Sequence, residues 1–259
     1  MVISCLIVLL CSTPSTKGEF AALPGGLSMY FEVHGASGTP VLLLHGGASS
    51  IDGTWSQVLP RLAKGHLVLA PEQQGHGHTA DLDRPLTYEQ MAEDTAAFLA
   101  QRKPGPVDVL GWSDGGIVAL LLARAHPELV HAVVVTGANW RADGVRPELL
   151  KWLATSKTSD WPARKGYPVP ERWPAFAEKL RRLWTDWERP MEELADVKRP
   201  VLVMAGDKDI VTLEHTLDMH RRLKGSALAI LPATGHETVR TRPEWVVAMA
   251  EAFFASAPR

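Results

Sequence analysis

The chain has 259 residues, of which 46% are hydrophobic and 22% are charged, and its formal net charge at pH 7 is -2. These values are typical of a globular protein with one sizeable core, and the charge gives no indication of nucleic acid or an acidic membrane surface as a partner. The two cysteines, Cys5 and Cys11, precede the predicted fold, and neither a CxxC nor an HExxH spacing occurs, so the sequence indicates no disulfide framework, metal site or cofactor.

Residues 1–20 are interpreted as a leader that takes no part in the fold. Val2 to Leu10 is an apolar run of signal-peptide length, but no basic residue precedes it and no A-x-A site follows it. The run is too short to span a bilayer, so we expect no stable membrane insertion. A degenerate secretion signal on a secreted or periplasmic protein is the preferred interpretation, and a cytoplasmic leader is the alternative.

From residue 29 onwards, strand and helix patterns alternate, which is typical of a mostly parallel α/β sheet with helices on both faces. The predicted strands are Met29 to His34, Val41 to Leu44, His66 to Ala70, Val107 to Leu110, Ala132 to Val135, Pro200 to Ala205 and Ala227 to Leu231. The predicted helices are Trp55 to Ala63, Thr87 to Arg102 and Ile117 to Ala125. Thr87 and Gln90 have capping-box spacing at the start of the second of these helices.

The alternation stops after Asn139, and residues 140–199 have a different composition. Six of the nine tryptophans lie in this segment: Trp140, Trp152, Trp161, Trp173, Trp184 and Trp187. Helical patterns are predicted for Pro147 to Thr155 and for Trp173 to Trp187. Packing of the indoles against the sheet is one interpretation, and lining of a pocket for an apolar acyl or alcohol group is the interpretation for a few of them.

A serine lies between glycines where the fourth predicted strand ends, in Gly111-Trp112-Ser113-Asp114-Gly115-Gly116. A strand, a one-residue turn and a helix impose a strained backbone on Ser113, which requires small residues two positions before and after it. The turn lifts the hydroxyl above the sheet and leaves the N–H of Asp114 at a helix N-terminus, where it can bind an oxyanion. The sequence therefore predicts a nucleophilic serine.

Polar residues also follow three other predicted strands. Gly206-Asp207-Lys208-Asp209 follows the strand that begins at Pro200, His236 follows the last strand, and His45-Gly46-Gly47 follows the second. Because the carboxyl ends of parallel strands meet at one edge of a sheet, we expect these residues near Ser113. The chain order of serine, acid and histidine is that of enzymes with a serine on such a turn.

With these motifs the chain resembles the α/β-hydrolase family over roughly residues 29–254, and Gly-Trp-Ser-Asp-Gly-Gly is most similar to the branch that contains valacyclovir hydrolase. The resemblance implies Ser113 as nucleophile, His236 as general base and Asp209 as the acid that orients it. Asp207, placed by the resemblance in the structural turn, is the alternative acid. Residues 21–139 and 200–259 would form the α/β-hydrolase core, and 140–199 a small helical cap over the site.

The resemblance also implies that the N–H groups of Gly47 and Asp114 form an oxyanion hole. The expected substrate-binding residues are Gly46, Trp112, Asp114 and Trp140. The Asp114 carboxylate would pair with a cationic group such as the α-amino group of an amino-acid ester, and helix capping is the alternative role. His45 is expected to be a structural hydrogen-bonding residue, and His76 with His78 to brace the floor of the site.

The expected function is hydrolysis of carboxylic esters with small to medium apolar or amino-acyl groups, through an acyl-enzyme and without a metal or cofactor. The expected partner is a small-molecule ester. Lactone hydrolysis or C–C bond cleavage of diketones by the same residues is the alternative reaction. A ligand receptor of the same fold without catalysis is the alternative from a different functional class.

Overall fold

The computed structural model describes residues 18–161 and 173–258, so the predicted leader lies outside the described residues up to residue 17. An eight-stranded sheet has the order β1-β2-β4-β3-β5-β6-β7-β8. Its strands are β1 (Glu19–Ala22), β2 (Ser28–His34), β3 (Val41–Leu44), β4 (Val68–Pro71), β5 (Val107–Trp112), β6 (Val130–Thr136), β7 (Val201–Gly206) and β8 (Ala227–Leu231). The β1-β2 and β2-β4 pairs are antiparallel, and the remaining pairs are parallel.

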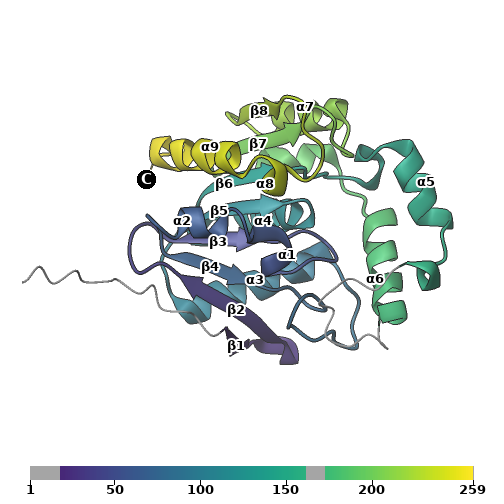
Figure 1. Cartoon of the computed structure of the whole chain (residues 1–259), viewed down its shortest axis with the longest axis horizontal. Coiled ribbons are helices and arrows are strands. Elements are labelled where there is room, and N and C mark those ends of the chain that lie inside the picture. Colours follow the sequence, from purple (N-terminus) through teal and green to yellow (C-terminus); the bar gives the residue numbers. More distant parts are fainter. Residues whose placement is uncertain (1–17, 162–172, 259) are drawn as a thin grey trace, which may run out of the picture.

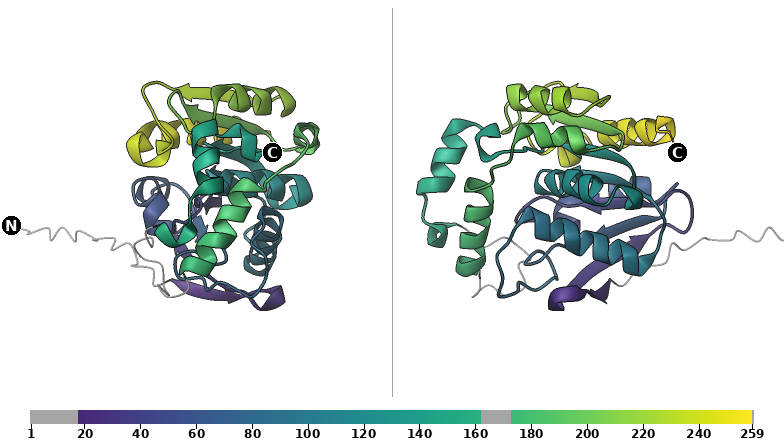
Figure 2. Two further views of the ribbon diagram at one scale, coloured as in Figure 1. Left: turned by 90° about the vertical axis from the view of Figure 1, so that its right-hand side faces the viewer. Right: turned by 180° about the vertical axis from the view of Figure 1, so that it is seen from behind.

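Helices cover both faces of this sheet (Figures 1 and 2). They are α1 (Ile51–Trp55), α2 (Leu59–Leu62), α3 (Tyr88–Arg102), α4 (Asp114–Ala125), α5 (Pro147–Thr155), α6 (Trp173–Thr185), α7 (Leu213–Arg222), α8 (Thr238–Thr241) and α9 (Pro243–Ser256). Short 3₁₀ helices occur at Pro24–Gly26, Pro127–Leu129, Ala142–Gly144, Thr158–Asp160 and Met191–Asp196. The predicted α/β class is confirmed. No helix in the described ranges is long and apolar enough to cross a membrane.

The two faces of the sheet belong to two separate hydrophobic clusters. In β3, Leu42 and Leu44 pack in the cluster that contains α3, α4 and α7, whereas Val41 and Leu43 pack in the cluster that contains α1, α2 and α9. All four side chains are fully buried. A strand buried on both faces has an unbroken apolar sequence, which explains why β3 and β6 show no alternation of polar and apolar residues in their central positions.

The predicted helix from Trp55 to Ala63 is wrong, because these residues belong to two short helices, α1 and α2. Pro60 has no N–H to donate, and in a continuous helix its ring would clash with the carbonyl of Ser56. Helix α1 therefore ends at Trp55, and Pro60 occupies a first-turn position of α2, where a missing N–H costs nothing.

Thr87 caps helix α3 as its sequence spacing predicts. The Thr87 hydroxyl oxygen accepts a hydrogen bond from the N–H of Gln90 at 3.1 Å. The Gln90 side chain, however, donates to Asp94 Oδ1 at 3.0 Å and is occupied there. Half of the predicted capping box is thus formed, and it fixes where α3 begins.

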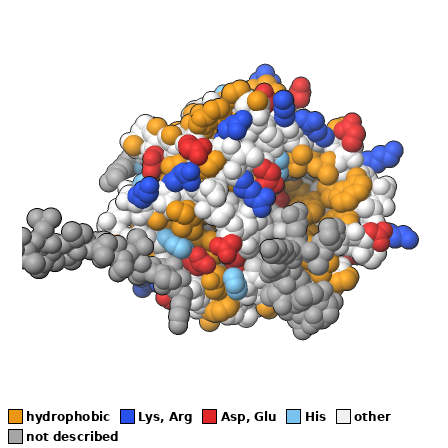
Figure 3. Space-filling view, viewed as in Figure 1, with side chains coloured by type: hydrophobic (Ala, Val, Ile, Leu, Met, Phe, Trp, Pro, Cys, Tyr) orange, Lys and Arg blue, Asp and Glu red, His pale blue; other side chains and the backbone are white. Residues whose placement is uncertain are grey.

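Residues 140–199, the predicted cap, contribute α5 and α6, which lie together beyond one side of the sheet (Figure 1). Three indoles stack across these elements: Trp152 on Trp161 at 5.5 Å between ring centroids, and Trp161 on Trp184 at 5.9 Å. Trp152, at the outer end, is 52% exposed, and hydrophobic side chains gather on the surface where α5 and α6 lie (Figure 3). The stack therefore runs from the surface toward the sheet.

Helix α4 lies unusually close to the sheet because of its glycines. A Cβ placed on Gly115 would lie 2.0 Å from the carbonyl oxygen of Leu44 at the end of β3, and a Cβ on Gly111 would lie 2.3 Å from the carbonyl oxygen of Gly115. Both contacts are with backbone atoms, which cannot turn aside as a flexible side chain does. The approach of α4 to β3 and β5 therefore depends on glycine at both positions.

We expect Gly115→Ala to lower the free energy of unfolding by about 3 kcal/mol or more, because the added methyl group meets packed backbone. Urea unfolding followed by circular dichroism measures this change. Gly65→Ala is the matched control, since a Cβ there has no neighbour within 4 Å, and we expect it to change stability by less than about 1 kcal/mol. Equal stabilities of the two variants would contradict the proposed dependence on glycine.

Candidate active site

Ser113 forms the turn between β5 and α4. Its backbone has φ 54° and ψ −123°, a conformation that residues with a side chain rarely adopt. Two hydrogen bonds hold it there: the Ser113 N–H donates to the carbonyl of Thr136 at 2.9 Å, and the Ser113 carbonyl accepts the N–H of Gly116 at 2.8 Å. Strain of this kind persists only where the surroundings fix it, and such residues gather at functional sites.

His236 lies between Ser113 and Asp209. Its Nε2 is 2.9 Å from Ser113 Oγ, and its Nδ1 is 2.7 Å from Asp209 Oδ1. Because an ionised carboxylate only accepts hydrogen bonds, Nδ1 of the neutral ring donates to Asp209, which leaves Nε2 to accept the serine proton. Trp112 packs on the His236 ring at 5.2 Å between centroids, and its Nε1 donates to the His236 carbonyl at 2.9 Å. The imidazole is thereby held on three sides.

The two aspartates after β7 have different contacts. Asp209 is buried, and besides His236 its Oδ1 accepts the N–H of Val211 at 3.1 Å. The Asp207 carboxylate instead accepts the backbone N–H groups of Ala233 and Thr234, both at 2.9 Å, and these bonds lower the pKa of Asp207. Asp207 thus anchors the loop that carries His236, and Asp209 touches the histidine itself.

The loop after β3 passes close to the serine, and only glycine fits at two of its positions, 46 and 47. A Cβ on Gly46 would lie 2.6 Å from the Trp112 ring and 3.3 Å from Ser113 Cβ. A Cβ on Gly47 would lie 2.2 Å from Asp114 Oδ2 and 2.8 Å from the Trp184 ring. The backbone of this loop therefore borders both Ser113 and the first residue of α4, whose first-turn N–H groups have no partner within the helix.

His45 holds the loop after β3 in place through both of its ring nitrogens. Its Nδ1 bonds to the carbonyl of Gly46 at 2.9 Å, and its Nε2 accepts the N–H of Gln73 at 3.0 Å. Both ring nitrogens are therefore used, and burial lowers the pKa of His45, so the ring is neutral. These contacts agree with the structural role expected for this histidine.

Asp114 is a buried carboxylate bound by side chains from two other helices. Its Oδ2 accepts the indole N–H of Trp184 in α6 at 2.8 Å, and the hydroxyl of Tyr88 in α3 also bonds to it. Burial raises the pKa of Asp114, and the hydrogen bonds from Trp184 and Tyr88 oppose this effect. The carboxylate therefore joins three helices next to the serine.

Trp112 and Trp140, two of the residues expected to bind substrate, are both buried. Trp112 borders Ser113 through the contacts described above. Trp140 is fully buried; its Nε1 donates to the carbonyl of Pro190 at 3.0 Å, and its backbone N–H donates to His215 Nε2 at 2.9 Å. The Trp140 side chain thus packs against Trp187 and Pro190, and it has no accessible surface for a substrate.

His76 and His78 have different surroundings although they share a loop. The His76 ring is buried against His45 and Phe176, and its Nδ1 bonds to the carbonyl of Gln74 at 2.9 Å. His78 has a side chain that is 61% exposed, and its Nδ1 lies 3.0 Å from the buried carboxylate of Glu72. The described residues contain no group of three side chains suited to hold a metal ion.

Sequence reasoning missed Glu72 and Tyr88, and it named Trp184 only as one of the six tryptophans of residues 140–199. Glu72 follows β4 directly, and its carboxylate accepts the N–H of Ile51 at 3.0 Å, which ties the start of α1 to the loop after β4. A carboxylate at the carboxyl end of a central strand is a signal that could have found it. Tyr88 and Trp184 carry no such signal, since each reaches Asp114 from a different helix.

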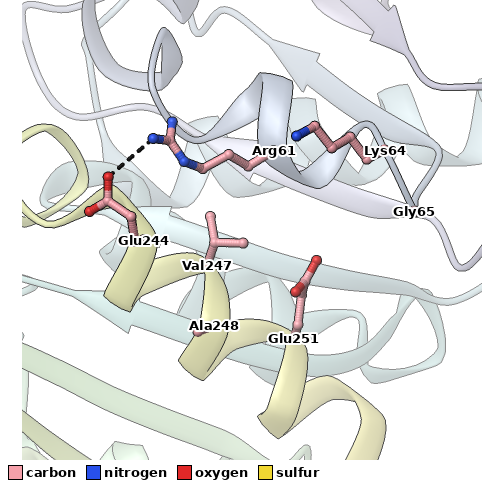
Figure 4. Close-up of a pocket in the computed structure, with 7 residues that line it drawn as sticks. All are labelled: Arg61, Lys64, Gly65, Glu244, Val247, Ala248 and Glu251. Carbon is pink, nitrogen blue, oxygen red and sulfur yellow. Dashed lines mark hydrogen bonds and ion pairs between the residues drawn. The ribbon is translucent and has the colours of Figure 1, made fainter.

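A separate groove lies between α2 and α9 (Figure 4). Its lining residues are Arg61, Lys64, Gly65, Glu244, Val247, Ala248 and Glu251. Arg61 forms an ion pair with Glu244 at 3.1 Å across it. None of the residues near Ser113 lines this groove, so it is distinct from the candidate site.

Comparison with known proteins gives one family match and several relatives. A family model described as the alpha/beta hydrolase family matches residues 41–249. Human serine hydrolase BPHL is 29% identical over 228 residues, which cover 82% of this chain and 77% of that protein. The pimeloyl-acyl-carrier-protein methyl ester esterase of Neisseria meningitidis serogroup B is 30% identical over 245 residues, which cover 81% of this chain and 90% of the esterase.

Solved structures share the fold at lower identity. The 2-hydroxy-6-oxo-6-phenylhexa-2,4-dienoate hydrolase from Rhodococcus sp. superimposes with a TM-score of 0.78 at 22% identity, covering 93% of this chain and 99% of that one. The enol-lactonase from Burkholderia xenovorans gives a TM-score of 0.71 at 19% identity, covering 92% of this chain and 100% of that one. These similarities concern the fold, which carries different chemistries.

We expect His76 to make the fold sensitive to acid. Burial lowers the pKa of His76 from 6.5 to about 3, so between these values the unfolded chain binds a proton that the folded chain does not. Stability therefore falls as the pH drops through this window, by up to about 1.4 kcal/mol per pH unit for one proton. Urea unfolding between pH 6.5 and 4.5 should show a shallower fall for His76→Phe, which cannot titrate. Identical slopes would mean that folded His76 binds the proton.

Proposed function

The chain belongs to the alpha/beta hydrolase family, and from that premise we propose that it hydrolyses carboxylic esters through an acyl-enzyme formed on Ser113. The observation that carries the proposal is the continuous contact from Ser113 Oγ to His236 Nε2 at 2.9 Å and from His236 Nδ1 to Asp209 Oδ1 at 2.7 Å. The three residues follow three different strands, β5, β8 and β7. A nucleophile, a base and an acid that orients the base are the groups that acyl transfer requires.

In the proposed mechanism, Ser113 Oγ attacks the ester carbonyl while His236 Nε2 takes its proton. Asp209 holds the imidazole in the required tautomer and stabilises the imidazolium. His236 then gives the proton to the departing alcohol, and the acyl group remains on Ser113. Water, deprotonated by the same His236 nitrogen, attacks the acyl-enzyme; His236 then returns the proton to Ser113 Oγ as the bond from Oγ to the acyl group breaks and the carboxylic acid leaves.

We assign the backbone N–H groups of Gly47 and Asp114 to the oxyanion hole. The assignment is supported by the position of Asp114 at the start of α4, where N–H groups lack helical acceptors, and by the close approach of Gly47 to the same residue. The positive end of α4 favours negative charge at this point as well. Donors fixed in advance are effective because no reorganisation is needed as the charge forms.

The proposed substrates are esters with a small to medium apolar or amino-acyl group. The buried Asp114 carboxylate, which is bound by two uncharged donors, supports an interaction with an ammonium group of the substrate. Two relatives are hydrolases, serine hydrolase BPHL and a methyl ester esterase. The cap supplies apolar surface, with Trp184 only partly buried beside Gly47.

A panel of p-nitrophenyl acyl esters, amino-acid esters, a lactone and a diketone tests the reaction class. We expect turnover of the esters, and Ser113→Ala should reduce kcat by roughly 10³-fold or more because the covalent route is lost. Turnover of only the lactone or only the diketone would replace ester hydrolysis by that reaction. Stoichiometric capture of a ligand without turnover would instead support a receptor, and full activity of Ser113→Ala would refute the nucleophile.

Asparagine substitutions separate the roles of the two aspartates. Asp209→Asn should lower kcat by roughly 10³- to 10⁴-fold, because the amide no longer fixes the imidazole tautomer. Asp207→Asn keeps one acceptor for the loop N–H groups and should lower kcat by less than about tenfold, mainly through loss of stability. Steady-state kinetics with one ester and a melting temperature for each variant make the comparison. A larger kcat loss for Asp207→Asn would exchange the two assignments.

A further inference from the structure

We propose that Trp184 and Tyr88 are positioning residues for the oxyanion hole: their hydrogen bonds compensate the Asp114 carboxylate, which would otherwise oppose the negative charge that forms on the substrate. The inference rests on the proposed function, because it concerns the same site. It assigns these two residues a part in the rate of hydrolysis, in addition to any part in packing.

The carboxylate of Asp114 lies against both residues of the proposed oxyanion hole. A Cβ on Gly47 would lie only 2.2 Å from Asp114 Oδ2, and Asp114 itself supplies the other N–H. A carboxylate this close to the Gly47 backbone repels a negative charge that forms on a substrate bound there, and the repulsion is weakly screened in a buried site. An uncompensated carboxylate here would therefore raise the energy of the tetrahedral intermediate, since it opposes the stabilisation that the N–H groups provide.

Two uncharged donors bind this carboxylate. The Trp184 indole N–H lies 2.8 Å from Oδ2, and the Tyr88 hydroxyl is hydrogen-bonded to the same side chain. In the described part of the chain, His236 is the basic side chain that influences the pKa of Asp114, and no lysine or arginine does so. Compensation by the protein therefore depends on these two hydrogen bonds and on the N-terminus of α4.

The Trp184 indole is held where it reaches both the carboxylate and the loop. Its ring would lie 2.8 Å from a Cβ on Gly47, while its N–H points to Asp114. On the other side it stacks on Trp161 with an interplanar angle of 20°. Trp184→Phe would keep an aromatic ring in this place but remove the N–H together with the five-membered ring of the indole, so its effect on packing must be separated from its effect on the hydrogen bond.

The proposal makes the effect of Trp184 depend on the charge of the substrate. An ester with an α-ammonium group brings a positive charge to Asp114 and supplies compensation itself. A neutral ester brings none and depends on the protein's donors. A hydrogen bond to a charged group has an energy that corresponds to roughly a tenfold to hundredfold change in rate, so the two kinds of ester should respond differently.

The experiment compares kcat for the methyl esters of phenylalanine and of 3-phenylpropionic acid, which differ only in the α-amino group. We expect Trp184→Phe to lower kcat for the neutral ester roughly tenfold or more, and for the amino-acid ester by less than about threefold. Trp152→Phe is the matched control, because it makes the same change in the stack, at the exposed end, and it should leave both rates within about twofold.

A second background distinguishes charge compensation from packing. When Asp114→Asn is already present, no carboxylate charge remains, so adding Trp184→Phe should change kcat for the neutral ester by less than about twofold. Equal losses on both esters, repeated in the Asn background, would refute the proposal. If Trp184→Phe fails to fold, which the loss of a cooperative unfolding transition would reveal, Tyr88→Phe provides the same test. Absence of Ser113-dependent turnover in the unmodified protein would refute the proposed function, a result distinct from uniform losses in an active one.

Discussion

The close packing of backbone against backbone around Ser113 is the constraint on which the rest of the site depends. Gly115 rests against the carbonyl of Leu44, and Gly111 against Gly115, so the strand and the helix on either side of the serine have no room to relax. The positive φ of Ser113 is maintained by that packing. The same contacts bring the loop after β3 next to the start of α4. One set of glycines thus fixes the hydroxyl and both proposed oxyanion donors relative to each other.

Two buried carboxylates belong to the candidate site, and their hydrogen-bond partners differ in kind. Asp209 faces a histidine that can become cationic, so its charge is balanced when the imidazolium forms. Asp114 faces an indole and a phenol, which bind its oxygens but carry no charge. A carboxylate satisfied by neutral donors keeps its affinity for a cation. The site therefore combines one carboxylate that we assign to the reaction with another that we propose responds to the charge of the substrate.

Sequence reasoning was most successful where local geometry decides the outcome. Ser113, Asp209 and His236 follow strands, and the ends of parallel strands meet at one edge, so their contact could be foreseen from spacing and order. The break between α1 and α2 is caused by a single proline, Pro60, which the prediction from the apolar pattern did not take into account. Tyr88 and Trp184 could not be foreseen, because their contact with Asp114 depends on how α3 and α6 pack on α4. The burial of Trp140 likewise could not be foreseen: its aromatic side chain is of a type that often lines pockets, but long-range packing buries it fully.

The distribution of tryptophans has a consequence for spectroscopy. Six of the nine indoles lie in residues 140–199, and three of these stack from the exposed Trp152 inward to Trp184. The excited states of stacked indoles couple, and a neighbouring carboxylate shifts the emission of the indole it binds. Intrinsic fluorescence and near-ultraviolet circular dichroism of this protein therefore report chiefly on residues 140–199. A rearrangement of the stacked indoles is thus visible optically without any attached label.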